Sequence, residues 1–141
     1  MKPTFLKLPL DIQALITGNH KRTLQLKSSV IQHIQLLVQT TKGEFPANPE
    51  YGCSIQEQLL KLSSPAHLLK TDLEAIVLNC ITKHEKRLHQ TDIQVTLERS
   101  LKNNSHQQSF AHFTIRGHTI KPVQPFEFEF KLKINPVTFK L

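Results

Sequence analysis

The sequence contains few cysteines and glycines, and it has no long run of apolar residues. Its only cysteines, Cys53 and Cys80, form no C-x-x-C pair, so the chain has no disulfide framework, and we expect both to be buried reduced thiols. Its four glycines are dispersed, which excludes a glycine-rich phosphate loop. No segment approaches the ~20 apolar residues of a membrane-spanning helix. The N-terminus lacks the apolar core of a signal peptide, so we expect a cytoplasmic protein without membrane insertion.

The 141 residues carry a formal net charge of +7, which suggests an acidic partner. The basic residues are scattered, however, and no run of five or six of them occurs. The aromatic residues are few and are not interleaved with basic ones, as a stacking surface for nucleic acid requires. We therefore expect a single soluble domain that does not bind nucleic acid, and keep a basic nucleic-acid adaptor as an alternative.

Helical spacing of apolar residues fills the first part of the chain. It predicts a helix from about Ser29 to Gln39, with Ser28 and Ser29 as N-cap residues, and a short helix that follows Ser54. The longest helix is predicted to begin at Ser63–Pro65 and to end near Arg87–His89. Basic residues near that end suit the helix dipole.

Alternation with a period of two fills the last part of the chain. It predicts strands at Ile93–Leu97, at Phe110–Ile120 with a break near Gly117, and at Phe126–Ile134. A turn at Lys102–His106 separates the first two. Because helices come first and strands last, the fold class is α+β. We expect two or three N-terminal helices, one of them long, packed on a C-terminal antiparallel sheet of about three strands.

The stretch GEFPANPEYGC, Gly43 to Cys53, lies between two predicted helices. Its two prolines push the preceding residues out of the helical region, and Gly52 can adopt a positive φ. Its composition therefore predicts an ordered turn rather than a catalytic site.

No arrangement of side chains predicts catalysis, a cofactor or a metal site. The eight histidines lack zinc-ligand spacing. The carboxylates near turns and helix ends do not form a visible acid–base pair, and no G-x-S-x-G motif occurs; these carboxylates are Glu44, Glu50, Glu57 and Glu85.

One charged segment, KHEKRL from Lys83 to Leu88, falls at the end of the long helix. Glu85 would lie at or beside the apolar stripe of that helix, where a carboxylate needs either solvent or a cation. On a continuous helix Arg87 would point roughly 200° away from it, so each charge would need a different partner. Two solvated charges at a frayed helix end are the alternative.

These segments together resemble the GPW-type baseplate wedge family, which includes the small wedge protein of contractile phage tails and the TssE subunit of type VI secretion systems. The resemblance covers about residues 27–135. Glu85 and Arg87 match the outer positions of a Glu-Pro-Arg motif, but Lys86 replaces its proline. The turn matches the motifs T-x-x-G-E-x and N/D-P-x-F/Y-G at Thr40, Gly43, Glu44, Asn48, Pro49, Tyr51 and Gly52.

The resemblance implies a structural subunit rather than an enzyme, with an N-terminal arm at residues 1–26 and a wedge domain at residues 27–141. It implies contacts with TssF-, TssG- and TssK-like wedge subunits and with the contractile sheath, in which Glu85 and Arg87 would be interaction residues. The arm favours a TssE-like protein over a phage protein. A lysozyme-like hydrolase remains an alternative, because some members of the family have been labelled lysozymes.

Overall fold

The computed structural model describes residues 5–6, 9–10, 12–18, 23–60, 66–102, 106–134 and 138–140. An antiparallel sheet with the strand order β3-β4-β5-β6 forms one layer of the molecule. Its strands are β3 (Leu88–Lys102), β4 (His106–Thr119), β5 (Pro125–Lys133) and the short β6 (Thr138–Lys140). The α+β class and the antiparallel sheet are thus confirmed, with β6 added to the three predicted strands.

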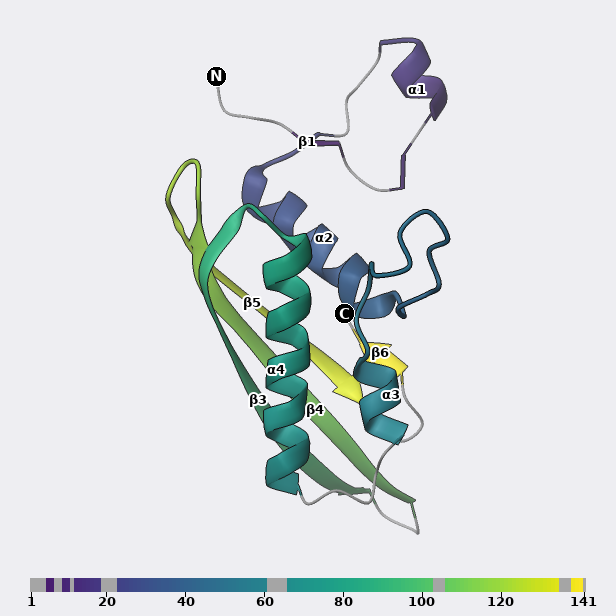
Figure 1. Cartoon of the computed structure of the whole chain (residues 1–141), viewed down its shortest axis with the longest axis vertical. Coiled ribbons are helices and arrows are strands. Elements are labelled where there is room, and N and C mark those ends of the chain that lie inside the picture. The colour runs from purple at the N-terminus through teal and green to yellow at the C-terminus, as the bar shows by residue number, and fades with distance from the viewer. Residues whose placement is uncertain are drawn as a thin grey trace.

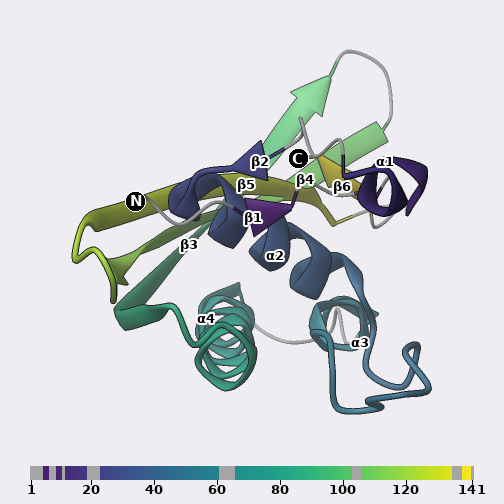
Figure 2. The same cartoon turned by 90° about the horizontal axis from the view of Figure 1, so that it is seen from above.

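Three helices cover one face of this sheet: α2 (Leu26–Gln39), α3 (Ile55–Leu60) and α4 (Ala66–His84). Helix α4 runs along the sheet, and α2 and α3 lie beside it on the same side (Figures 1 and 2). None of the helices in the described ranges is long and apolar enough to cross a membrane. The predicted start of the longest helix at Ser63–Pro65 lies outside the described residues, as does most of the predicted turn after Lys102.

The core lies between the helices and the inner face of the sheet. Phe113 of β4 stacks on its cross-strand partner Phe130 of β5, with ring centroids 4.6 Å apart. Alternate residues of each strand point inward, so burial of this single face drives the two layers together. The helices contribute the buried residues Val30, Ile34, Leu37, Leu69, Leu73, Val77 and Ile81, and the strands contribute Ile93, Val95, Ala111, Phe113, Ile115, Phe126, Phe130 and Leu132.

The sequence predictions for the start of α2 and for a break in β4 are wrong. Helix α2 begins at Leu26 with Gln25 as its N-cap, not after Ser28 or Ser29. Strand β4 runs unbroken through Gly117, which pairs with Phe126. The register between β3 and β4 shifts at His89–Asp92, and a Cβ on Gly117 would lie 3.1 Å from the His89 carbonyl oxygen. Gly117 therefore allows a close approach of the irregular part of β3 rather than a break.

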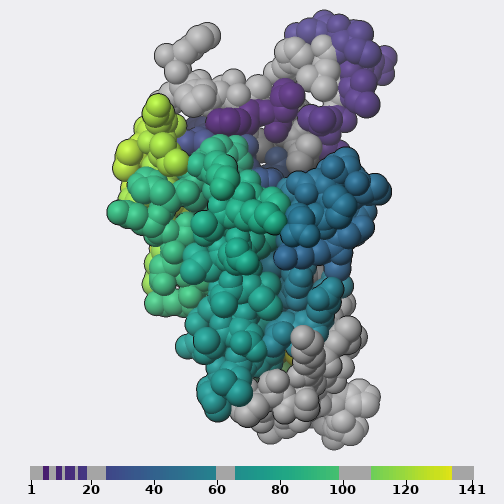
Figure 3. Space-filling model, in the orientation of Figure 1, coloured from purple at the N-terminus to yellow at the C-terminus, as the bar shows by residue number. Residues whose placement is uncertain are grey.

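Three short elements are described near the N-terminus, and the first of them lies against α2 and the residues that follow α4. They are β1 (Phe5–Leu6), α1 (Ile12–Ile16) and β2 (Thr23–Leu24), and β1 pairs with β2. Figure 3 shows β1, in purple, above the end of the teal helix α4, and the blue segment after α2 beside that helix. The predicted extended arm thus contains a two-stranded ribbon.

Candidate functional site

The last turn of α4 sets the position of the charged segment. The helix ends at His84, and the Glu85 amide donates the final helical hydrogen bond to the Ile81 carbonyl oxygen at 2.8 Å. Residues 86 and 87 form a turn, and β3 begins at Leu88. The prediction that the helix continues to Arg87–His89 is therefore wrong, and so is the inference that Glu85 and Arg87 point apart.

Glu85 and Arg87 form a two-point ion pair. The Arg87 Nε donates to Glu85 Oε1 at 2.8 Å, and Nη2 donates to Oε2 at 2.6 Å. The Arg87 backbone amide also donates to Oε1, at 3.0 Å. This fork geometry is the strongest form of a carboxylate–guanidinium contact. The Glu85 side chain is 1% exposed and that of Arg87 is 31% exposed, so the acid is internal and the arginine reaches the surface.

Two further side chains fix the pair in place. His33 of α2 lies with Nδ1 2.7 Å from Glu85 Oε2, where the ring N–H donates to the carboxylate. Arg87 Nη1 donates to the Ser29 hydroxyl at 2.9 Å. Burial by itself raises the pKa of Glu85, but hydrogen bonds from Arg87 and His33 outweigh it and hold that pKa at about 2. A carboxyl group this firmly ionised cannot act as a general acid near neutral pH.

Lys86 ends the helix by a different means from the proline of the family motif. Its ammonium donates to the Thr82 carbonyl oxygen at 3.1 Å. Thr82 follows Ile81, which accepts the final helical hydrogen bond, so its own carbonyl group is one of those left without a helical partner at the end of α4. A lysine in this position therefore satisfies the helix end that a proline would terminate.

The segment Gly43–Cys53 is an ordered turn, as predicted. The Gly43 amide donates to the Pro49 carbonyl oxygen at 2.8 Å, and the Cys53 amide donates to that of Thr40 at 2.8 Å. Gly43 and Gly52 both have positive φ, of 85° and 114°. A Cβ on Gly52 would lie 2.4 Å from the Thr40 carbonyl oxygen, so both the backbone angle and the available space require glycine.

The turn and the end of α4 meet in space. The Tyr51 ring lies 5.2 Å from the His84 ring and 6.0 Å from the His33 ring, measured between centroids. Burial raises the pKa of Tyr51, and the nearby Cys80 and Glu85 charges add to that shift. Glu50 accepts from Lys83 at 3.0 Å. The two motifs that were separate in the sequence thus form one contiguous site.

Sequence reasoning missed three members of this site. Ser29 was interpreted as a helix cap, whereas its hydroxyl accepts from Arg87. The sequence prediction treats His33 like the other histidines and gives no role to Phe5, whose ring centroid lies 5.2 Å from the Arg87 guanidinium carbon. The one available signal was position: His33 lies three residues after Val30 and four before Leu37, beside the buried stripe of α2.

The remaining candidate residues are engaged locally. Glu44 accepts from the Thr41 amide at 2.9 Å, and Glu57 lies in the first turn of α3. Within the described ranges, no three histidine, cysteine or acidic residues are placed to bind a metal ion. The arrangement holds an arginine at the surface on a buried acid, and it contains no acid–base pair positioned across a cleft.

The protein is thus a small α+β domain. At the end of its longest helix, the buried Glu85 holds the partly exposed Arg87 at the surface. Residues 24–121 match the model of a family described as baseplate wedge protein gp25. The match covers more than half of the chain, so the protein belongs to this baseplate wedge family. A comparison with curated proteins finds no match.

Two solved structures have a similar fold. A Geobacter sulfurreducens protein described as a proposed tail lysozyme superposes with a TM-score of 0.56 at 15% identity, covering 78% of this chain and 92% of that one. A chain from the baseplate complex of the type VI secretion system superposes with a TM-score of 0.51 at 17% identity, covering 75% of this chain and 91% of that one. At these identities the likeness concerns the fold.

Proposed function

We propose that the protein is a TssE-like wedge subunit in the cytoplasmic baseplate of a type VI secretion system. It binds TssF-, TssG- and TssK-like subunits in a hetero-oligomeric assembly and helps to start assembly of the contractile sheath. The match to the baseplate wedge family carries this proposal, and the similar chain from a type VI baseplate complex supports it. A contractile phage-tail wedge protein is the second candidate, because the description of the matched family, baseplate wedge protein gp25, does not specify a secretion system.

Arg87 is the residue proposed to contact a partner subunit. Its guanidinium is partly exposed, and it borders a groove of about 320 Å³ lined by Leu6, Leu10, Ser29, Gln32 and His33. Glu85 is too buried to contact a partner, so its proposed role is to orient Arg87. A pre-oriented arginine loses little freedom when it binds a carboxylate, which favours it as an interface residue.

A sheet edge offers a second contact. Strand β6 pairs with only Lys131–Lys133 of β5. Among the described strands, the part of β5 before Lys131 therefore pairs with β4 on one side and forms an edge of the sheet on the other. A strand from another subunit could pair there through main-chain hydrogen bonds. The part of β5 proposed for this contact is therefore the part that precedes Lys131.

The proposed role is not enzymatic. A hydrolase of the lysozyme type needs one protonated carboxyl group and a second carboxylate at a defined distance. Glu85 is ionised and bound to Arg87. Glu50 is exposed and accepts a hydrogen bond from Lys83, which lowers the pKa of Glu50 below its ordinary value. These pairings support a structural role, although one similar structure is described as a proposed tail lysozyme.

Co-purification with the wedge subunits tests the proposal. We expect Arg87→Ala to reduce recovery of the complex by about 30-fold or more, since loss of an interfacial charge partner costs ~2–5 kcal/mol. Lys70→Ala is the control, because Lys70 also pairs with a glutamate, Glu74, but lies near the beginning of α4, away from both proposed contacts. Circular dichroism must show both variants folded at the assay temperature.

If Arg87→Ala unfolds, Arg87→Lys replaces it in the same assay. Lysine keeps the charge beside Glu85 but cannot reproduce the fork. A folded Arg87→Lys protein that is recovered with its partners as well as wild type would exclude Arg87 as a specific contact. Failure of the wild-type protein to bind any wedge subunit would contradict the proposed function itself.

A further inference from the structure

Two thiols from distant parts of the sequence lie side by side under the turn. Cys53 closes the turn segment and Cys80 lies in α4, and their residues are 2% and 6% exposed. Both side chains line the same pocket, and the Cys80 thiol donates to the carbonyl oxygen of Gly52, the residue directly before Cys53, at 3.1 Å. Both cysteines are free. A disulfide between the two residues would therefore require only that the turn segment and α4, which already meet at this hydrogen bond, adjust to disulfide geometry.

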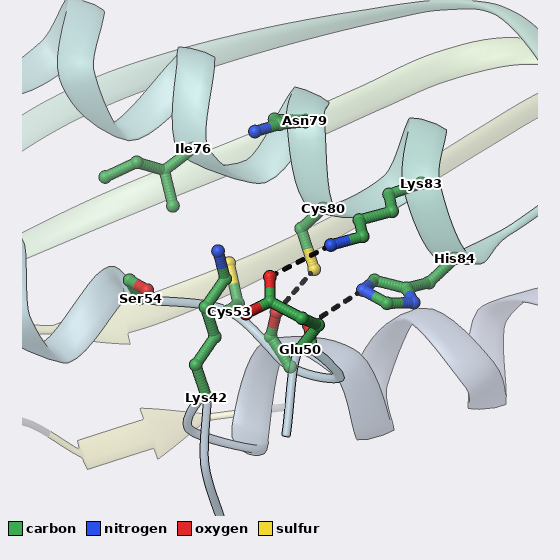
Figure 4. Close-up of a pocket in the computed structure, with 10 residues that line it drawn as sticks. Lys42, Glu50, Cys53, Ser54, Ile76, Asn79, Cys80, Lys83 and His84 are labelled. Atoms are coloured by element: carbon green, nitrogen blue, oxygen red, sulfur yellow. Dashed lines mark hydrogen bonds and ion pairs between the residues drawn. The ribbon is translucent and has the colours of Figure 1, made fainter. Parts of the chain in front are cut away.

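A pocket of about 230 Å³ leads to this pair. Its lining includes both cysteines together with Lys42, Glu50 and Lys83, which Figure 4 labels around the two sulfur atoms. The pocket is wide enough to admit water-sized molecules, so a small oxidant can reach the thiols although the residues are largely buried. Two lysines beside the pocket favour a negatively charged sulfur within it.

The two thiols are electrostatically unequal. The hydrogen bond from Cys53 lowers the pKa of Cys80 against the effect of burial, and the charges of Lys42 and Lys83 lower it further. The hydrogen bond with Cys80 and burial raise the pKa of Cys53. Lys83 follows Cys80 by three residues on α4 and lines the same pocket, so Cys80 is the thiol better placed to act as the nucleophile, with Cys53 as its neighbouring thiol.

We propose that Cys53 and Cys80 are a hydroperoxide-sensitive thiol pair that closes into a disulfide between the turn segment and helix α4. In the first step the Cys80 thiolate attacks a peroxide oxygen, the O–O bond breaks, and Cys80 sulfenic acid and hydroxide form. In the second step the Cys53 sulfur attacks the Cys80 sulfur, and the sulfenic hydroxyl leaves as water with the Cys53 proton. The two sulfurs together lose two electrons, which the peroxide accepts.

The disulfide would fix the turn against α4 beside the Glu85–Arg87 pair. Gly52 precedes Cys53, and Tyr51 before it touches both His33 and His84. A covalent link at Cys53 therefore limits the motion of the residues that pack around the candidate site. The inference concerns the isolated chain and does not depend on its role in a baseplate.

Intact-protein mass spectrometry tests the wild-type protein directly. The reduced protein is treated with one equivalent of hydrogen peroxide, quenched, unfolded and alkylated. We expect a mass loss of two hydrogen atoms, no alkylation, and a cross-linked peptide that joins Cys53 to Cys80 and disappears on reduction. The urea-unfolded protein receives the same treatment as a positive control for oxidation. If that control is oxidised but the folded protein still carries two alkylated thiols, the proposal is overturned. An intermolecular disulfide as the main product would overturn it as well.

Single variants separate the two roles. In Cys53→Ser the sulfenic acid has no partner thiol, so dimedone should label Cys80, whereas Cys80→Ser should be labelled about tenfold less. Equal labelling of the two variants would contradict the assignment of Cys80 as nucleophile. Lys42→Gln should slow disulfide formation several-fold relative to Lys86→Gln, which removes the same charge outside the pocket. Equal rates in the two lysine variants would contradict the pocket charge as the source of reactivity.

Discussion

Glu85 and Arg87 are only two residues apart, yet their side chains face each other in a two-point ion pair. This is possible because α4 ends at His84 and the next two residues turn the chain into β3. The Glu85 side chain is 1% exposed and that of Arg87 is 31% exposed, so the buried carboxylate holds the guanidinium in position at the surface. Any effect of Arg87 on assembly therefore has to be separated from its effect on the fold.

Stability should depend on pH through Glu85. Its pKa falls from an ordinary value of 4.5 to about 2 on folding, so the unfolded chain binds the proton more tightly. The contribution of the pair is then fully present above about pH 4.5 and is lost as the pH falls toward 2. A shift of this size corresponds to roughly 3 kcal/mol. Urea unfolding across this range should show the loss in wild type and a much smaller change in Glu85→Gln.

The matched control for this measurement is Glu129→Gln, because Glu129 is exposed on the outer face of the sheet. We expect that variant to change the free energy of unfolding by no more than about 0.5 kcal/mol and to keep the wild-type pH dependence. Wild-type acid sensitivity in Glu85→Gln would show that other groups control it.

Gly52 should tolerate substitution much less well than Gly43. Both have positive φ, but a Cβ on Gly43 meets nothing within 4 Å, whereas one on Gly52 meets the Thr40 carbonyl oxygen. Gly43→Ala should therefore cost about 1 kcal/mol for backbone strain alone, and Gly52→Ala clearly more. Gly52→Val adds a β-branched side chain and should be worse still. Thermal unfolding provides the comparison, and equal melting temperatures for the two alanine variants would exclude a steric role for Thr40.

Periodicity predicted the layers of this fold but not the details of its site. Repeats of apolar residues located α2, α4 and the three longer strands because burial of one face decides each element. The predicted end of α4 was too late because the basic residues there suit the end of a helix dipole. In the structure the Arg87 amide donates to the Glu85 carboxylate, in a turn that lies beyond the helix. His33 is 52 residues from Glu85 in the sequence, and no local pattern indicates such a contact.

The purified protein should not hydrolyse peptidoglycan. Lys83 lowers the pKa of Glu50, and Arg87 and His33 lower that of Glu85, so neither is held protonated for acid catalysis. Glu44 accepts from the Thr41 amide within the turn. Release of soluble fragments from labelled cell walls should stay at the level of a buffer blank, with an authentic lysozyme as the positive control. Hydrolysis that disappears in Glu44→Gln, Glu50→Gln or Glu85→Gln would overturn the structural interpretation.

The last prediction concerns the lysine that replaces the proline of the family motif. Lys86 lies two residues beyond the end of α4, where a proline interrupts no helical hydrogen bond, and its own ammonium contributes only one exposed contact, to Thr82. Lys86→Pro should therefore change the free energy of unfolding by less than about 1 kcal/mol and keep the Glu85–Arg87 fork. Lys83→Pro, three residues earlier and inside the helix, should cost about 3 kcal/mol. Urea unfolding gives both values, and the pH dependence assigned to Glu85 reports whether the fork survives. A large loss in Lys86→Pro, equal to that in Lys83→Pro, would mean that the turn after α4 requires the Lys86 backbone conformation, and that this chain ends its helix in a way the proline of the motif cannot reproduce.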